Sequence, residues 1–249
     1  MRCRSTLAAL AALACWGSAL AQDYVVPANT PEHIRRAVES PKRPAEHRER
    51  DAARKPAEVL TLSGIEPGDH IIEFASFGQY YSTMLVEAVG PQGRVDMYDL
   101  PYTERFAGEA SRAFDAEHDN AFYHQQDYND VEFPQNVDAV FNVLYYHDLK
   151  PNGIDTAKLN AKLFDALKPG GVYLIIDHKA EDGSGWRDAS TIHRMGVETI
   201  IEEVTAAGFV LEVDSDLLAN PDDDRTKMVF TPGTRGATDR AVLLFRKPR

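Results

Sequence analysis

The sequence has few cysteines and few positive charges. Its two cysteines, Cys3 and Cys15, both lie in the first 21 residues, which we expect to be removed on export. The mature chain would then have no disulfide, no thiolate nucleophile and no cysteine-ligated metal. Acidic residues (39) outnumber lysine and arginine (27), so the formal net charge is −12. Such a surface repels phosphate backbones and anionic membranes, which argues against nucleic acid as a partner and favours a small-molecule substrate, neutral by default.

A long hydrophobic run is found only at the N-terminus. A basic start at 1–4 precedes the apolar stretch 7–20, and residues 19–21 form a small-x-small cleavage site. This order predicts a secretory signal peptide at 1–21, a periplasmic or secreted protein, and no stable membrane insertion after cleavage. Two alternatives stay open. One is a membrane span, although the run is shorter than the ~20 residues that a bilayer requires, and the other is a lipid anchor on Cys15.

Residues 22–68 form a polar, charge-rich segment, which we expect to be an N-terminal helical arm or lid ahead of an α/β domain at 69–249. Pro31 stands at a helix start, and later prolines divide the segment into short helices. The charged side chains suit a solvated helix stabilised by pairs four residues apart. In the alternative interpretation the arm covers the strand ends and supplies Arg48 or Arg54 to a carboxylate.

The stretch 71–82 organises the rest of the chain. An apolar pair ends in the acid Glu73, and a turn of small residues leads into a helical run. This is the pattern of the first strand, loop and helix of a nucleotide-binding α/β unit. Apolar strands and amphipathic helices then alternate, which predicts one three-layer sheet domain with its site at the carboxyl ends of the strands. The predicted strands are 71–74, 94–98, 121–125, 137–144, 172–176, 210–213 and 241–245.

The order of motifs along the chain resembles that of class I S-adenosylmethionine-dependent methyltransferases, and more narrowly a bacterial group of predicted methyltransferases with signal peptides. The resemblance covers most of residues 48–248 and implies a Rossmann-like fold. It further implies a seven-stranded, mostly parallel sheet whose last strand is antiparallel. The motifs that carry it are RKPAEVL at 54–60, the loop at Glu73, YHD at 146–148, LKPGG at 167–171, DH at 177–178, GSG at 183–185, HR at 193–194, AAGF at 206–209 and RGATDR at 235–240.

The resemblance implies S-adenosylmethionine as the cofactor and gives roles to three acids at successive strand ends. Asp99, after the second strand, would accept both ribose hydroxyls. Asp127, after the third, would accept the adenine amino group. Glu73, at the end of the first, would orient the loop or bind the cofactor's ammonium through water.

The loop after Glu73 departs from the family's pattern of three spaced glycines. Ala75, Phe77 and Gln79 stand at the glycine positions and leave only Gly78. We assign Ala75, Phe77 and Gly78 to the cofactor site, where a Cβ takes up space that the methionine part requires. Two functions therefore stay open. The chain is an exported small-molecule methyltransferase, or it is a non-catalytic or redirected protein of this fold that has lost S-adenosylmethionine binding and binds another small ligand.

His147 and Asp148, after the fourth strand, form the predicted catalytic pair. An imidazole titrates near neutral pH, and in folds of this type this position faces the transferred methyl. His147 would remove the acceptor's proton, and Asp148 would orient it or act beside it. Tyr81 and Tyr146 belong to a tyrosine cluster that either packs under the loops or forms an aromatic pocket. We assign four further residues to the substrate site: Tyr81, Tyr146, His178 and His193.

Two other chemistries fit the same strand ends. Asp148, Asp177 and His178 could together bind a divalent metal, although their spacing is not diagnostic and no metal is assigned. Alternatively, His147 and Asp148 could serve a hydrolase or lyase on another ligand.

Overall fold

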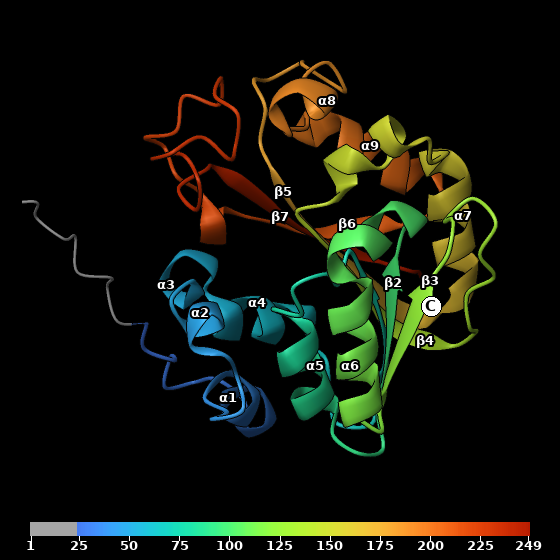
Figure 1. Cartoon of the computed structure of the whole chain (residues 1–249). Coiled ribbons are helices and arrows are strands. Elements are labelled where there is room, and N and C mark those ends of the chain that lie inside the picture. The colour runs from blue at the N-terminus through green and yellow to red at the C-terminus, as the bar shows by residue number, and fades with distance from the viewer. Residues whose placement is uncertain (1–23) are drawn as a thin grey trace, which may run out of the picture.

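The computed structural model describes residues 24–249, and its centre is a seven-stranded sheet (Figure 1). The strand order is β3-β2-β1-β4-β5-β7-β6. Strands β1 to β5 pair in parallel, and β7 is antiparallel to both β5 and β6, which confirms the predicted sheet. The strands are β1 (His70–Phe74), β2 (Arg94–Asp99), β3 (Ala121–Gln125), β4 (Val137–Val143), β5 (Leu167–His178), β6 (Val210–Ser215) and β7 (Arg240–Arg246).

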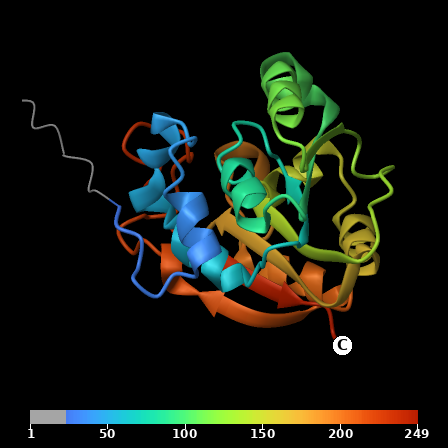
Figure 2. The same cartoon turned by 90° about the horizontal axis from the view of Figure 1, so that it is seen from below.

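Helices cover both faces of this sheet (Figure 1, Figure 2). Neighbouring strand residues point to opposite faces, so Ile71 joins one hydrophobic core and Ile72 the other. Helices α1 (Glu32–Val38), α4 (Pro56–Ser63) and α5 (Ser82–Val89) close the first core, and α7 (Thr156–Ala166) and α9 (Val197–Ala206) close the second. The continuous apolar run of β5 is therefore buried on both sides.

The N-terminal segment lies partly in the core and partly over the strand ends. Ile34 of α1 and Leu60 of α4 are buried in the same core as α5. Between them, α2 (Ala45–Arg48) and α3 (Asp51–Arg54) reach the segment before β7, residues 216–239, as Figure 1 shows. The Nζ of Lys55 donates to the Leu217 carbonyl at 2.8 Å, which ties the two segments together.

Three boundaries differ from those expected from the sequence. The sequence predicts a helical run over 80–89, but α5 begins at Ser82, two residues later, because the loop before it contains left-handed residues. It also predicts one helix over 103–117, where the structure has a short 3₁₀ turn and a π turn followed by α6 (Glu109–Glu117). Strand β5 starts at Leu167, because the backbone of Gly170 and Gly171 pairs with Lys247 after β7.

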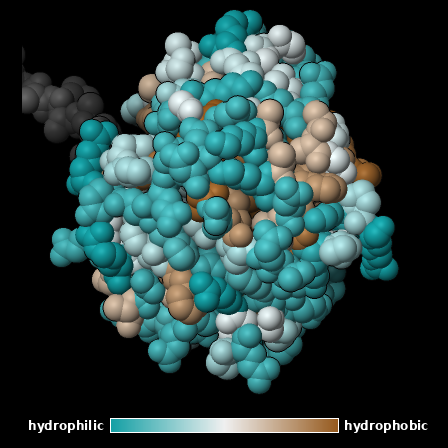
Figure 3. All heavy atoms as spheres, turned by 90° about the vertical axis from the view of Figure 1, so that its right-hand side faces the viewer, coloured by the Kyte–Doolittle hydropathy of each residue, from teal (hydrophilic) through white to brown (hydrophobic). Residues whose placement is uncertain are grey.

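The predicted signal peptide lies outside the described residues. Within 24–249, the helices are all too short or too polar to span a bilayer. The face drawn in Figure 3 is mostly hydrophilic, and its hydrophobic side chains gather in small patches.

Strands β1 and β4 are neighbours in the sheet, although the chain continues from β1 toward β3 on one side and from β4 toward β5 on the other. Loops from the two strands therefore diverge at their carboxyl ends and leave a crevice, the usual place of a ligand in an open α/β sheet.

Candidate active site

A cavity of about 330 Å³ opens at the carboxyl ends of β1 and β4. The loop after β1 forms one wall and the segment after β4 forms another, while the arm and the segment before β7 complete it. The lining residues are Arg50, Arg54, 73–78, Tyr80, Tyr81, Val143, Leu144, His147, Asp148, His178, Phe230 and Arg235.

The loop after β1 is held by the carboxylate of Asp99 at the end of β2. Asp99 Oδ1 accepts from the Ser76 backbone N–H at 2.7 Å and from the Ser76 hydroxyl at 3.2 Å. Three loop residues, Ala75, Gly78 and Gln79, have positive φ values of 53°, 87° and 45°. The loop thus takes the left-handed turns that glycine favours, although alanine and glutamine occupy two of them.

Asp99 has an unused oxygen. Its side chain is fully buried, and within the described residues no donor reaches Oδ2. Burial raises the pKa of this carboxyl to about 6, although the hydrogen bonds from Ser76 oppose the shift. A buried carboxylate oxygen without a partner is unfavourable, and a ligand hydroxyl would remove that cost.

Phe77 lines the cavity and directly follows Ser76, the residue that bonds Asp99. Its ring packs edge-on against Phe106, at 5.7 Å between centroids, and against Tyr145, at 6.1 Å. These partners follow β2 and β4, so the ring lies across the end of β1. Asp99 does not line the cavity.

Glu73 lies at the bottom of the cavity and is buried. Its Oε2 accepts from the Ser82 hydroxyl at 2.6 Å. Burial raises the Glu73 pKa to about 8; Ser82 lowers it, and the neighbouring charge of Asp99 raises it. Glu73 is therefore largely protonated at neutral pH, so it can donate a hydrogen bond as well as accept one.

His147 is buried and fixed by a carboxylate from the neighbouring strand. Its Nδ1 lies 2.6 Å from Asp177 Oδ1, and its backbone N–H donates to Asp177 Oδ2 at 2.8 Å. Asp177 therefore holds the proton on Nδ1 and leaves the Nε2 lone pair free. Burial lowers the His147 pKa, but the charge and hydrogen bond of Asp177 outweigh it, and the pKa is raised.

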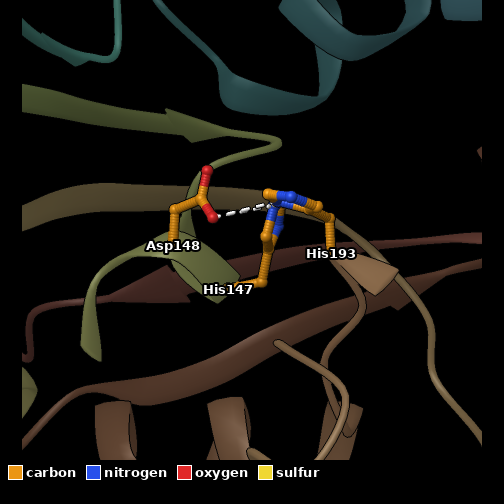
Figure 4. Close-up of side chains that lie close together, drawn as sticks. All are labelled: His147, Asp148 and His193. Carbon is orange, nitrogen blue, oxygen red and sulfur yellow. Dashed lines mark hydrogen bonds and ion pairs between the residues drawn. The ribbon is translucent and has the colours of Figure 1, made fainter. Parts of the chain in front are cut away.

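Two further polar atoms approach His147 Nε2, one from His193 and one from Asp148 (Figure 4). His193 Nδ1 lies 3.3 Å from His147 Nε2 and 3.1 Å from Asp148 Oδ1, and Asp148 Oδ1 lies 3.6 Å from His147 Nε2. His193 has a φ of 56°, a left-handed conformation that brings its ring against His147. These three residues, rather than the Asp148, Asp177 and His178 set considered from the sequence, are grouped closely enough to bind one metal ion.

Of the other residues expected to bind substrate, two line the cavity and one does not. Tyr81 and His178 line the cavity, and His178 Nδ1 lies 2.7 Å from the Thr238 hydroxyl. Tyr146 instead points into the core, where its hydroxyl donates to Glu203 at 2.9 Å. Asp127 is exposed and accepts from the Asn129 backbone N–H at 2.9 Å, so it caps a turn outside the cavity.

The pairing of Asp177 with His147 and the presence of Arg50 and Arg235 at the cavity were not predicted from the sequence. Asp177 stands in a DH pair at a strand end, and this pattern does not indicate which side chain the carboxylate contacts. Of the two arginines considered, Arg54 lines the cavity, whereas Arg48 donates to the Ser40 carbonyl at 3.2 Å and does not. Arg235 lies in the RGATDR motif, but it comes beside the arm only through folding.

No protein-family model and no curated protein matches the sequence. Solved structures do match. A methyltransferase from Mesorhizobium loti superposes with a TM-score of 0.58 at 17% identity, covering 79% of this chain and 99% of that one. A putative sarcosine dimethylglycine methyltransferase from Galdieria sulphuraria gives 0.58 at 15% identity, covering 88% and 91%. The chain has the fold of the S-adenosylmethionine-dependent methyltransferases.

That fold does not fix the reaction. The [4+2]-cyclase SpnF also superposes on this chain, with a TM-score of 0.56 at 15% identity and 83% of each chain covered. The function therefore has to be argued from the residues of the cavity.

Proposed function

We propose that the protein is an exported S-adenosylmethionine-dependent methyltransferase that acts on a small molecule. The observation that carries the proposal is the buried Asp99 carboxylate at the end of β2, whose Oδ2 lacks a donor among the described residues. A pair of ribose hydroxyls would supply donors at this strand end. Glu73 and the backbone of Ala75 and Gly78 line the adjoining cavity, where the methionine part would bind.

Bound S-adenosylmethionine would supply an electrophilic methyl group. The protein would then have to align a nucleophile and remove its proton. His147 Nε2 is the atom proposed to take that proton, because Asp177 fixes the tautomer and stabilises the charged ring. Asp148 and His193 would orient the acceptor from the other side of Nε2.

The same fold without cofactor binding is the alternative, and Phe77 decides between the two. Its ring packs against Phe106 and Tyr145, and it follows Ser76, which bonds Asp99, so we propose that S-adenosylmethionine reaches Asp99 only after Phe77 changes rotamer. Phe77 is half-buried, and its ring makes only packing contacts with two aromatic side chains. A change of its rotamer therefore loses contact area but breaks no hydrogen bond.

Calorimetric titration with S-adenosylhomocysteine tests the proposal. We expect micromolar binding by the parent protein, loss of binding in Asp99→Ala, and tighter binding in Phe77→Gly, which needs no rotamer change. Glu39→Ala, which removes the exposed partner of Arg35 on α1 outside the cavity, is the matched acid-to-alanine control and should bind like the parent. Absence of binding in the parent and in Phe77→Gly would show that the fold has been redirected to another ligand.

Export is tested separately by the mass of the protein recovered from the native host. The proposal expects a chain that starts at Gln22, in a periplasmic or culture fraction. A chain that retains its first residues in the cytosol contradicts this part of the proposal.

A further inference from the structure

A second and larger cavity, of about 740 Å³, adjoins the first. It lies between the arm and the segment before β7, two segments that are side by side in Figure 1. The two cavities share six lining residues: Arg50, Arg54, Leu144, His178, Phe230 and Arg235. The two cavities are therefore neighbours, and together they extend from the loop after β1 to the start of β7.

Arginine dominates the lining of this second cavity, although the whole chain is acidic. Its lining includes Arg50, Arg54, Arg235 and Arg240, and Glu49 is its only carboxylate. Within residues 24–249 the ion pairs of the structure include none of these four arginines. The nearby Asp51 is already bonded to Arg43 at 2.7 and 2.8 Å and to the Tyr80 hydroxyl at 2.6 Å.

Arg54 and Arg50 are positioned by an aromatic ring instead of an acid. Their guanidinium carbons lie 4.5 and 4.9 Å from the Tyr80 ring centroid. Burial lowers the Arg50 pKa, and the positive charge of Arg54 lowers it further. Like charges gathered in a partly desolvated space repel one another, so the protein gains stability when an anion enters.

Arg240 gives independent evidence of a missing partner. Its side chain is 7% exposed, and its Nε has no hydrogen-bond acceptor among the described residues. One Nη donates to the Ala53 carbonyl at 2.5 Å, which fixes the guanidinium against the arm. A buried cation with an unused N–H at a cavity wall requires an acceptor from a ligand.

The position of Arg240 separates this site from that of the cofactor. Arg240 pairs with His178 across β5 and β7, and β7 lies three strands from β1. At about 4.8 Å between strands, the backbone of β7 lies on the order of 14 Å from that of β1. His178, whose ring centroid is 5.9 Å from that of His147, joins the two regions.

We propose that this cavity binds the oxyanion group, a carboxylate or a phosphate, of a small acidic molecule. Arg54, Arg235 and Arg240 would bind the oxyanion, and the rest of the molecule would extend past His178 toward His147. This proposal deepens the proposed function: it rests on that function in taking the bound molecule to be the methyl acceptor. It also revises the expectation of a neutral substrate, because the charge of the cavity is opposite to that of the chain as a whole.

Arginine Nε–H resonances of the ¹⁵N-labelled protein provide the test, with inorganic phosphate and malonate as probes at constant ionic strength. We expect the Arg240 Nε–H signal to shift saturably, because a charge-assisted hydrogen bond forms at that proton. Arg54→Gln and Arg235→Gln should weaken binding on the order of tenfold each. Arg112→Gln, which removes an exposed partner of Glu104 outside both cavities, is the matched control.

The two probes separate the sources of the oxyanion. A response to phosphate alone indicates a phosphorylated acceptor, and a response to malonate alone indicates a carboxylic acid. No saturable shift with either probe, or equal affinity in the parent and in both glutamine variants, would overturn the proposal. The titration is done without S-adenosylhomocysteine, so its outcome is independent of the calorimetric test of the cofactor site.

Discussion

His147 Nδ1 lies 2.6 Å from Asp177 Oδ1, although the two residues belong to segments 30 positions apart. The contact exists because β4 and β5 are parallel neighbours, so the residues that follow one strand meet the end of the next. It fixes the ring of the proposed base, and it leads to a prediction that requires no knowledge of the acceptor.

Replacing Asp177 with Asn should lower the His147 pKa, because the neighbouring charge is removed while burial remains. A histidine with a raised pKa stabilises the fold below its unfolded pKa of about 6.5, and this contribution is lost as the pH rises through the folded value. Asp177→Asn should therefore destabilise the protein more at pH 5.5 than at pH 8.5. NMR titration of the His147 ring and denaturant unfolding at the two pH values measure both effects. An unchanged His147 pKa would contradict the assigned role of Asp177.

Glu73→Gln should stabilise the protein at alkaline pH. The folded pKa of Glu73, about 8, lies above its usual value, so folding favours the protonated acid and stability falls as the pH rises from about 4.5 through 8. Gln keeps the size without the charge, and we expect a gain of roughly 1 to 3 kcal/mol at pH 9 and little change at pH 5. Urea unfolding at both pH values checks this, and a variant with the parent's pH dependence would contradict it.

Tyr146→Phe should reduce stability by about 1 to 2 kcal/mol without affecting either ligand titration. The Tyr146 hydroxyl donates to Glu203 and accepts from Asn160 Nδ2, both at 2.9 Å, and it faces the core rather than the cavity. Tyr102→Phe is the control, because Tyr102 is exposed and its hydroxyl contacts only that of Tyr145, at 3.2 Å. A loss of ligand binding in Tyr146→Phe would restore the role in substrate binding expected from the sequence.

Asp51→Ala should destabilise the protein by about 3 to 5 kcal/mol, because it leaves the buried Arg43 without its carboxylate partner. The same change releases the Tyr80 hydroxyl and should disturb Arg50 and Arg54, which stack on that ring. Thermal unfolding measures the stability loss. Lys42→Met, which removes the exposed pair with Glu87, is expected to change stability by no more than about 1 kcal/mol. Equal effects of the two variants would show that the Arg43 pair is not an anchor of the arm.

The alternation of apolar strands and helices was sufficient to predict the sheet, because burial on both faces leaves a continuous hydrophobic signature in each central strand. The acids at the strand ends were located from the same strand pattern, because the carboxyl ends of parallel strands lie at one edge of the sheet. The direction of each side chain could not be predicted. Asp99 and Asp127 occupy equivalent places in the sequence pattern, yet one is buried behind the loop and the other is exposed.

The sequence by itself determined the three-layer α/β architecture, the placement of the site at the carboxyl ends of the strands, and the candidacy of His147 and Asp148, because these depend on local periodicity and on the order of elements along the chain. Only the tertiary structure decided that His193 rather than His178 joins this pair, that Tyr146 faces the core, and that arginines from the arm and from the segment before β7 meet around one cavity. Those groupings join segments far apart in the chain, and their physical origin is the packing of loops over the sheet edge, which no local pattern records.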